Sequence, residues 1–118
     1  MLLKNKNITV VGAGCTGVAT SNFLVSKEAS VVLIDIKSRI ELEKNLLSLS
    51  PRVRTLFGCS EIPESSDLIV LSPGVNINAS FLEGSRRRGV QIISEIELAF
   101  RFTKTPIIAV TGTNGKST

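Results

Sequence analysis

Three glycines near the start of the chain could hold a phosphate. Gly12, Gly14 and Gly17 have the spacing G-x-G-x-x-G and directly follow the apolar, β-branched run NITVV at residues 7–11. Glycine lets backbone N–H groups approach an anion closely, and a helix that begins there adds the positive end of its dipole. The pattern predicts a strand, a tight turn and a helix that bind a phosphate or pyrophosphate.

A carboxylate follows at the spacing that dinucleotide folds use. Residues 30–35, SVVLID, form a nearly continuous apolar run that ends in Asp35, which is typical of a parallel strand buried on both faces. Asp35 stands about 20 residues beyond the glycines, where such folds place the acid that accepts from a ribose hydroxyl. These features alone leave an NAD-binding domain of an oxidoreductase as one interpretation.

A second glycine turn follows another apolar run, 107–111, near the other end. Lys116 offers a charge for β- and γ-phosphates, and the Ser117 hydroxyl is suited to Mg²⁺. The common ATP-binding pattern has a further glycine five positions before Gly115. Here the nearest glycine is Gly112, so the loop is shorter than that pattern.

The elements that must position these residues alternate along the chain. Apolar runs predict strands, and wider apolar spacing with helix-capping residues predicts helices. The alternation predicts an α/β, doubly wound, Rossmann-like and mainly parallel sheet of about five strands with helices on both faces, plus a C-terminal strand stub. Beyond the first strand, strands are predicted at 30–35, 53–58, 67–72, 90–93 and 107–111, and helices at 16–27, 40–49, 80–88 and from 94.

Local signals sharpen these boundaries. Thr16 is expected to cap the first helix, and the leucines and isoleucine of 40–49 predict an amphipathic helix that ends before Pro51. The Ser-Pro-Gly sequence at 72–74 predicts a turn in which the glycine permits a positive φ. Residues 94–97, SEIE, have capping-box spacing, so the last helix is expected to start at Ser94.

Composition restricts the function classes. The 118 residues are 42% hydrophobic, enough for one domain with a core, and the net charge of +4 does not require a nucleic acid partner. The chain has no histidine, which excludes a Ser/His or Cys/His catalytic pair within it. Cys15 and Cys59 lack metal-ligand or disulfide-framework spacing. Without an apolar stretch of about 20 residues or a signal peptide, a cytoplasmic protein is expected.

The compact loop TGTNGKST at 111–118 resembles the ATP loop of the Mur ligases and their folylpolyglutamate synthetase relatives. Three further motifs occur in the family's order along the whole chain: GAGCTG at 12–17, Asp35 at the end of its strand, and SPG at 72–74. The sequence SEIEL at 94–98 completes the set. Within the Mur ligase family, these motifs are most similar to the branch that adds D-glutamate to UDP-N-acetylmuramoyl-L-alanine.

The resemblance implies an ATP-dependent amide ligase of peptidoglycan synthesis. Such an enzyme uses ATP and Mg²⁺ to activate the substrate carboxylate as an acyl phosphate, which the amine of D-glutamate then attacks. The neighbouring L-alanine-adding ligase shares both glycine turns and stays open as an alternative. Folylpolyglutamate synthetase fits less well, since that family lacks a leading domain of this type.

The resemblance also assigns site residues by position. The residues expected to contact the UDP group are Gly14, Cys15, Thr16, Asp35, Ile36, Lys37, Ser72, Pro73 and Gly74. The residues expected to bind ATP are Thr113, Asn114, Gly115, Lys116, Ser117 and Thr118, with Ser117 on Mg²⁺. Family members carry a hydroxyl and an arginine where this chain has Ile36 and Lys37, and lysine cannot reproduce the arginine fork.

The same resemblance predicts how the chain is divided. Residues 1–103 are expected to form the UDP-substrate-binding domain, and 104–118 a linker, the first strand and the ATP loop of a truncated central domain. The chain alone is then expected to be inactive and to bind no ATP or Mg²⁺. An orphan strand at 107–111 would seek another edge, which predicts a monomer or a weak dimer without nucleic acid or membrane partners.

Overall fold

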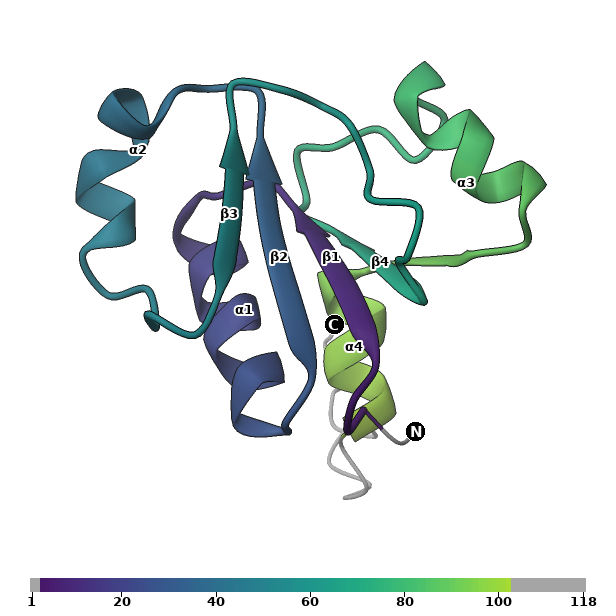
Figure 1. The fold of residues 1–118 in the computed structure, drawn as a ribbon, viewed down its shortest axis with the longest axis horizontal. Helices are drawn as coiled ribbons and strands as arrows, with labels where there is room; N and C mark the ends of the chain where they lie inside the picture. The colour runs from purple at the N-terminus through teal and green to yellow at the C-terminus, as the bar shows by residue number, and fades with distance from the viewer. Residues whose placement is uncertain (1–2, 103–118) are drawn as a thin grey trace, which may run out of the picture.

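Five parallel strands form one sheet in a computed structural model that describes residues 3–102 (Figure 1). Their order across the sheet is β3-β2-β1-β4-β5, so the chain starts in the middle and builds outward in both directions. The strands are β1 (Asn7–Val11), β2 (Ser30–Asp35), β3 (Arg54–Phe57), β4 (Leu68–Leu71) and β5 (Gln91–Ser94). The helices are α1 (Cys15–Ser26), α2 (Arg39–Leu46), α3 (Glu83–Arg87) and α4 (Glu95–Phe102), with a 3₁₀ turn, η1 (Ser80–Leu82), before α3.

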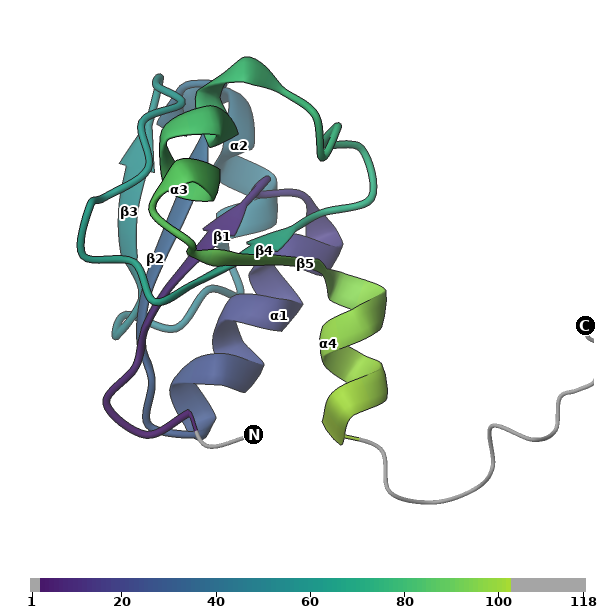
Figure 2. The same ribbon diagram turned by 90° about the vertical axis from the view of Figure 1, so that its right-hand side faces the viewer.

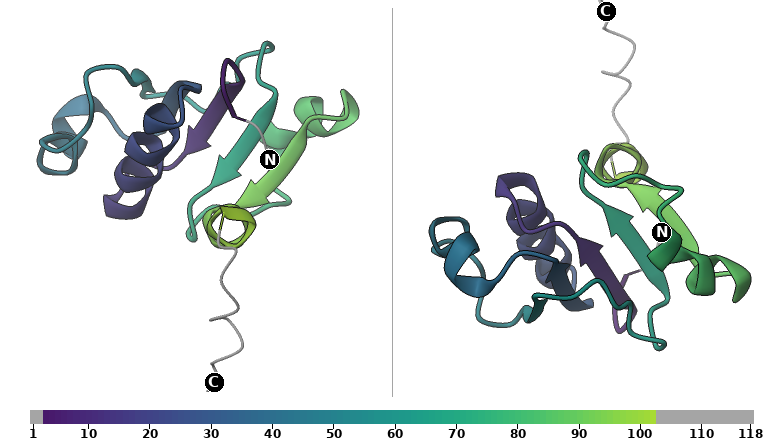
Figure 3. Two further views of the ribbon diagram at one scale, coloured as in Figure 1. Left: turned by 90° about the horizontal axis from the view of Figure 1, so that it is seen from below. Right: turned by 90° about the horizontal axis from the view of Figure 1, so that it is seen from above.

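Helices cover both faces of the sheet. Alternate residues of the strands point to opposite sides, so Val10 and Leu33 pack with α1, α2 and α4, whereas Val11 and Ile34 face η1 and its flanking loops. Figures 2 and 3 show α1 and α4 on one side of the strands and α3 on the other. The α/β, doubly wound, Rossmann-like prediction is confirmed within the described residues.

The strand predictions agree with the structure to within about two residues at each end. Apolar, β-branched runs are buried on both faces here; β2 has the pattern of a fully buried strand along Val31, Val32, Leu33 and Ile34. The strand stub at 107–111 and the domain division at 103 and 104 lie outside the described residues. No helix within residues 3–102 is long and apolar enough to span a membrane.

The predicted cap of α1 is wrong. The helix begins at Cys15, and its N-cap is Gly14, which makes no side-chain cap hydrogen bond. Thr16 is already the second helical residue, so its side chain cannot occupy the N-cap position. The helix starts earlier because the glycine turn reverses the chain directly after β1.

The second helix is shorter and less amphipathic than predicted. α2 begins after Ser38, which forms a complete capping box with Glu41, and it ends at Leu46. Ile40 is 83% exposed and Leu47 is 84% exposed, so neither packs in the core. Only Leu42 of this helix is buried, because α2 lies beyond α1 near the edge of the sheet (Figure 1).

Three further details differ from the sequence predictions. Residues 80–88 are not one helix but η1 followed by α3. Ser94 caps α4 by accepting from the Glu97 N–H at 3.0 Å, while the Glu97 carboxylate binds Arg101 at 2.7 Å, so the expected reciprocal half of the box is replaced by an ion pair. Gly74 is not among the positive-φ glycines of residues 3–102, so the turn after β4 does not use that freedom.

Candidate functional site

The turn between β1 and α1 depends on two of its three glycines. Gly12 has φ +105° and continues the β ladder by donating to the Ile34 carbonyl at 2.8 Å. A Cβ on Gly17 would lie 1.8 Å from the Gly12 carbonyl oxygen, which no side chain can tolerate. A Cβ on Gly14 would meet nothing within 4 Å. Close backbone packing therefore requires glycine at 12 and 17, whereas Gly14 is left open to solvent.

The start of α1 presents backbone donors to solvent. Gly14, Cys15 and Thr16 are exposed, and the first N–H groups of a helix have no intrahelical acceptor. The Val18 N–H donates to the Gly14 carbonyl at 3.0 Å, one turn into the helix. The N–H groups and the helix dipole together can hold an anion such as a phosphate or pyrophosphate.

Asp35 supports this turn from the neighbouring strand. One carboxylate oxygen, Oδ2, accepts from the Ala13 N–H at 2.8 Å, and Oδ1 accepts from the Lys37 N–H at 2.8 Å. Sequence reasoning expected a ribose-binding or uracil-bordering acid and missed this backbone role. Each oxygen keeps a further lone pair that a ligand donor could use. Ile36 and Lys37 are exposed beside it, with Ile36 at 74%.

Ser72 joins the end of β4 to the same turn. Its N–H donates to the Val11 carbonyl at 3.0 Å, and its Oγ lies 3.1 Å from the Gly12 carbonyl oxygen. The Oγ also lies 2.9 Å from Oε2 of Glu95, the first residue of α4. Pro73 and Gly74 are exposed in the turn that follows, which the Val75 N–H closes on the Ser72 carbonyl at 3.0 Å.

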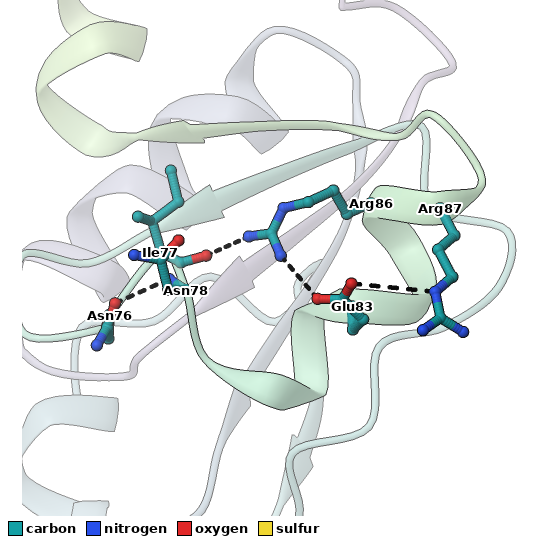
Figure 4. A network of polar contacts seen from close by, with 6 residues as sticks. All are labelled: Asn76, Ile77, Asn78, Glu83, Arg86 and Arg87. Carbon is teal, nitrogen blue, oxygen red and sulfur yellow. Dashed lines mark hydrogen bonds and ion pairs between the residues drawn. The ribbon is translucent and has the colours of Figure 1, made fainter.

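A polar network on the protein surface secures the loop after that turn (Figure 4). Arg86 of α3 donates to the Ile77 carbonyl and forms an ion pair with Glu83 at 3.2 Å. Arg87 reaches the other oxygen of Glu83 at 3.9 Å. The Asn78 N–H donates to the side chain of Asn76 at 2.8 Å. These exposed side chains add to the packing of Val75 and Ala79 against the core in holding the loop.

The structure brings the UDP-site residues predicted by sequence to one edge of the sheet. β1, β2 and β4 are adjacent and parallel, so the turn at 12–14, Asp35–Lys37 and the loop from Ser72 leave the same carboxyl edge. The chain turns to α1 on one face after β1 and towards α3 on the other after β4. The crevice at such a reversal of strand order is where open α/β sheets bind ligands.

Hollows in the surface lie beside or away from this edge. One of about 430 Å³ lies at the amino edge of the sheet, lined by residues such as Thr9, Arg54 and Ser66. Another, of about 390 Å³, runs between α1 and α4 and reaches Glu95. The candidate site itself consists largely of exposed turns.

The predicted ATP site lies outside the described residues. The ATP-binding residues 113–118, including Ser117 as the Mg²⁺ ligand, lie outside the part of the chain that the structure describes. Cys15 and Cys59 are both free thiols. Within residues 3–102, no group of three histidine, cysteine, aspartate or glutamate side chains could hold a metal ion.

Comparison with known proteins gives matches along the whole chain. UDP-N-acetylmuramoylalanine--D-glutamate ligase of Desulfatibacillum aliphaticivorans is 45% identical over 121 residues, covering 100% of this chain and 27% of that protein. The proteins of the same name from Alkaliphilus oremlandii and Geobacter sp. are each 43% identical and also cover 100% of this chain. The chain therefore spans about a quarter of the length of these relatives, 27% in each case.

Among solved structures, Pen from Bacillus thuringiensis matches 76% of this chain and 31% of its own at 18% identity, with a TM-score of 0.46. The family described as Mur ligase MurD-like, N-terminal domain, matches residues 6–94. That range contains every strand of the sheet and all three loops of the candidate site. The chain belongs to the Mur ligase MurD-like N-terminal domain family.

Proposed function

We propose that this chain binds the UDP end of UDP-N-acetylmuramoyl-L-alanine within a ligase that adds D-glutamate to it. The observation that carries the proposal is the 45% identity, over the entire chain, to a protein named as that ligase. The fold agrees with it, since three loops of the predicted site leave one edge of the sheet at its reversal of strand order. This proposal replaces the NAD-binding and L-alanine-adding alternatives.

The proposed division of labour follows from the chemistry of the three loops. The N–H groups at the start of α1, around Cys15 and Thr16, hold the negatively charged pyrophosphate. Asp35–Lys37 borders the uracil, where Ile36 offers an exposed apolar surface and Lys37 a positive charge. Ser72–Gly74 lies on the opposite side of the site. These residues bind and orient the substrate and break no bond.

The chemical step is proposed to take place elsewhere in the larger protein. Lys116 and the Ser117 hydroxyl have the donor types that suit ATP phosphates and Mg²⁺. ATP would supply the phosphoryl group that activates the substrate carboxylate. We infer that 104–118 contains a linker and the beginning of that ATP-binding domain, and that the protein acts in the cytoplasm. We also infer that the chain alone shows no D-glutamate-dependent phosphate release. A measurable rate of such release from the chain would contradict this.

Alkylation of Cys15 tests the binding proposal directly. The thiol is exposed at the first residue of α1, where the pyrophosphate is expected, whereas Cys59 N–H donates to the Asp35 carbonyl near the uracil side. A Cys59→Ser chain therefore leaves one reporting thiol. Saturating UDP-N-acetylmuramoyl-L-alanine should slow iodoacetamide labelling of Cys15 at least several-fold, as measured by mass spectrometry.

Two control ligands, UMP and NAD, show which part of the ligand protects Cys15 and which class of ligand binds. UMP lacks the second phosphate and should protect Cys15 less than the UDP-linked substrate. NAD should give no protection. If NAD protects Cys15 and the UDP-linked substrate does not, the assignment is wrong and the oxidoreductase interpretation returns. Thermal unfolding offers a second readout, since a ligand at a hundredfold excess over its Kd adds about 2.7 kcal/mol of stability.

A further inference from the structure

The Ser72 hydroxyl lies between two acceptors from distant parts of the chain. Its Oγ is 3.1 Å from the Gly12 carbonyl oxygen and 2.9 Å from Oε2 of Glu95. A hydroxyl has one proton and can donate to one of them at a time, and an ionised carboxylate is the stronger acceptor. The carboxylate of Glu95 therefore holds the Ser72 side chain in the orientation that keeps Oγ against Gly12.

Close packing continues from Ser72 into the first turn of α1. A Cβ on Gly12 would lie 2.7 Å from Ser72 Oγ, so no space separates the two residues. A Cβ on Gly17 would lie 1.8 Å from the Gly12 carbonyl oxygen and 3.3 Å from Ser72 Oγ. A close-packed interior transmits displacement instead of absorbing it. Movement of Ser72 would therefore move the Gly12 carbonyl and the turn that carries the helix donors.

We propose that Glu95 is a positioning residue of the candidate site, which acts through Ser72 to set the conformation of the glycine turn. The inference rests on the proposed function for its consequence, substrate affinity, but not for its structural part. Direct contact between Glu95 and the ligand is not its role, because a carboxylate beside a pyrophosphate repels it. Glu95 instead accepts a hydrogen bond from Ser72, which connects the start of α4 to the turn before α1.

A simpler role for Glu95 must be separated from this one. Acidic residues in the first turn of a helix stabilise it through the dipole, and Glu95 stands at that position in α4. Glu97 shares the first turn of α4 and carries the same charge, but its carboxylate binds Arg101. Glu97→Ala is thus the matched control: it removes one charge from the same turn and leaves Ser72 untouched.

The test compares Glu95→Ala, Glu95→Gln, Glu97→Ala, Ser72→Ala and the double variant Glu95→Ala/Ser72→Ala in the whole chain. The first readout needs no ligand: the backbone amide resonances of Gly12 and Gly17 in ¹H–¹⁵N spectra. Glu95→Ala should shift both resonances, and Glu95→Gln, which keeps an acceptor for Ser72, should restore them. In the Ser72→Ala background, removal of Glu95 should cause no additional shift.

The second readout is the Kd for UDP-N-acetylmuramoyl-L-alanine by calorimetry. Glu95→Ala should weaken binding about tenfold, as expected for the loss of a hydrogen bond to a charged group, and Glu95→Gln about twofold. Glu97→Ala should leave the Kd unchanged while lowering the unfolding temperature as Glu95→Ala does. A purely structural role would lower stability in both variants and change the Kd in neither.

Each result decides one of the two proposals. The positioning role is wrong if Glu95→Ala shifts the Gly12 and Gly17 amide resonances no more than Glu97→Ala does. It is also wrong if Glu95→Ala shifts these resonances as much in the Ser72→Ala background as in the wild-type chain. If the wild-type chain does not bind the UDP-linked substrate, the proposed function of this chain fails, and the amide resonances still decide the role of Glu95.

Discussion

The two loops that flank the candidate site are built in opposite ways. The turn at 12–14, between β1 and α1, is held through its backbone: the Gly12 N–H donates to the Ile34 carbonyl, the Ala13 N–H donates to the Asp35 carboxylate, and Gly17 packs against the Gly12 carbonyl. The loop at 72–79, between β4 and η1, is anchored at Ser72, but farther along it is held by Arg86, an exposed side chain of α3 (Figure 4).

This difference indicates a fixed wall and an adjustable wall at the carboxyl edge of the sheet. Buried backbone contacts leave little room for change, whereas exposed ion pairs between flexible side chains contribute little and rearrange readily. The turn at 12–14 suits a charged group that is the same in every substrate, such as a pyrophosphate. The loop at 72–79 depends in part on the exposed contacts of Arg86, so it is the more easily deformed of the two. Substitutions in each wall can break or sharpen this contrast.

The largest effect is expected at Gly17. Gly17→Ala places a Cβ 1.8 Å from the Gly12 carbonyl oxygen, so the turn must deform, and the chain should lose about 3 kcal/mol or more of unfolding free energy. Gly14→Ala is the matched control, since Gly14 has φ −78° and open space around it; it should cost about 1 kcal/mol or less. Urea denaturation measures both, and equal losses would show that the turn is not tightly packed.

A smaller loss is expected at Asp35. Asp35→Ala removes the acceptor of the Ala13 and Lys37 N–H groups and should cost about 1 to 3 kcal/mol, because the Ala13 donor loses its partner in a partly buried site. Asp67 makes a similar bond to the Asn7 N–H at 2.8 Å, but at the exposed amino edge. Asp67→Ala should cost about 1 kcal/mol or less in the same urea titration, since water replaces the lost acceptor.

A second substitution of Asp35 separates its support of the turn from a direct role in ligand binding. Because Asp35 supports the turn from inside, Asp35→Asn, which keeps one acceptor oxygen, should recover part of the stability of Asp35→Ala. If Asp35→Ala is as stable as the wild type, its bonds to the turn contribute nothing and only a direct ligand role would remain for it.

The smallest effect is expected in the adjustable wall. Arg86→Ala removes the contacts to Ile77 and Glu83 and should cost about 0.5 to 1 kcal/mol, because the side chain is exposed. Amide hydrogen exchange at 76–79 should accelerate several-fold while exchange at 12–18 stays unchanged. Arg87→Ala removes only a 3.9 Å ion pair and is the control. Faster exchange in both loops would mean that the two walls move together.

The positions of the strands and of the glycine turn could be predicted from local sequence because they depend on neighbouring residues. The run SVVLID coincides with β2, and the G-x-G-x-x-G spacing places the start of α1 to within one residue. The apolar spacing of 40–49 misled the prediction of α2, since Ile40 and Leu47 have no core to pack against near the sheet edge. Periodicity records which side chains are apolar, not whether a partner layer covers them.

The sequence by itself determined the fold class, the expected binding turns and the family resemblance, because apolar periodicity and glycine spacing are local and the motifs recur in order. Only the tertiary structure decided that Asp35 supports the turn and that Glu95 reaches Ser72. Residues 35 and 13, or 95 and 72, meet because parallel strands in the order 3-2-1-4-5 end at one edge. Contacts set by strand order leave no local signal in the sequence, since the two residues that meet lie far apart along the chain.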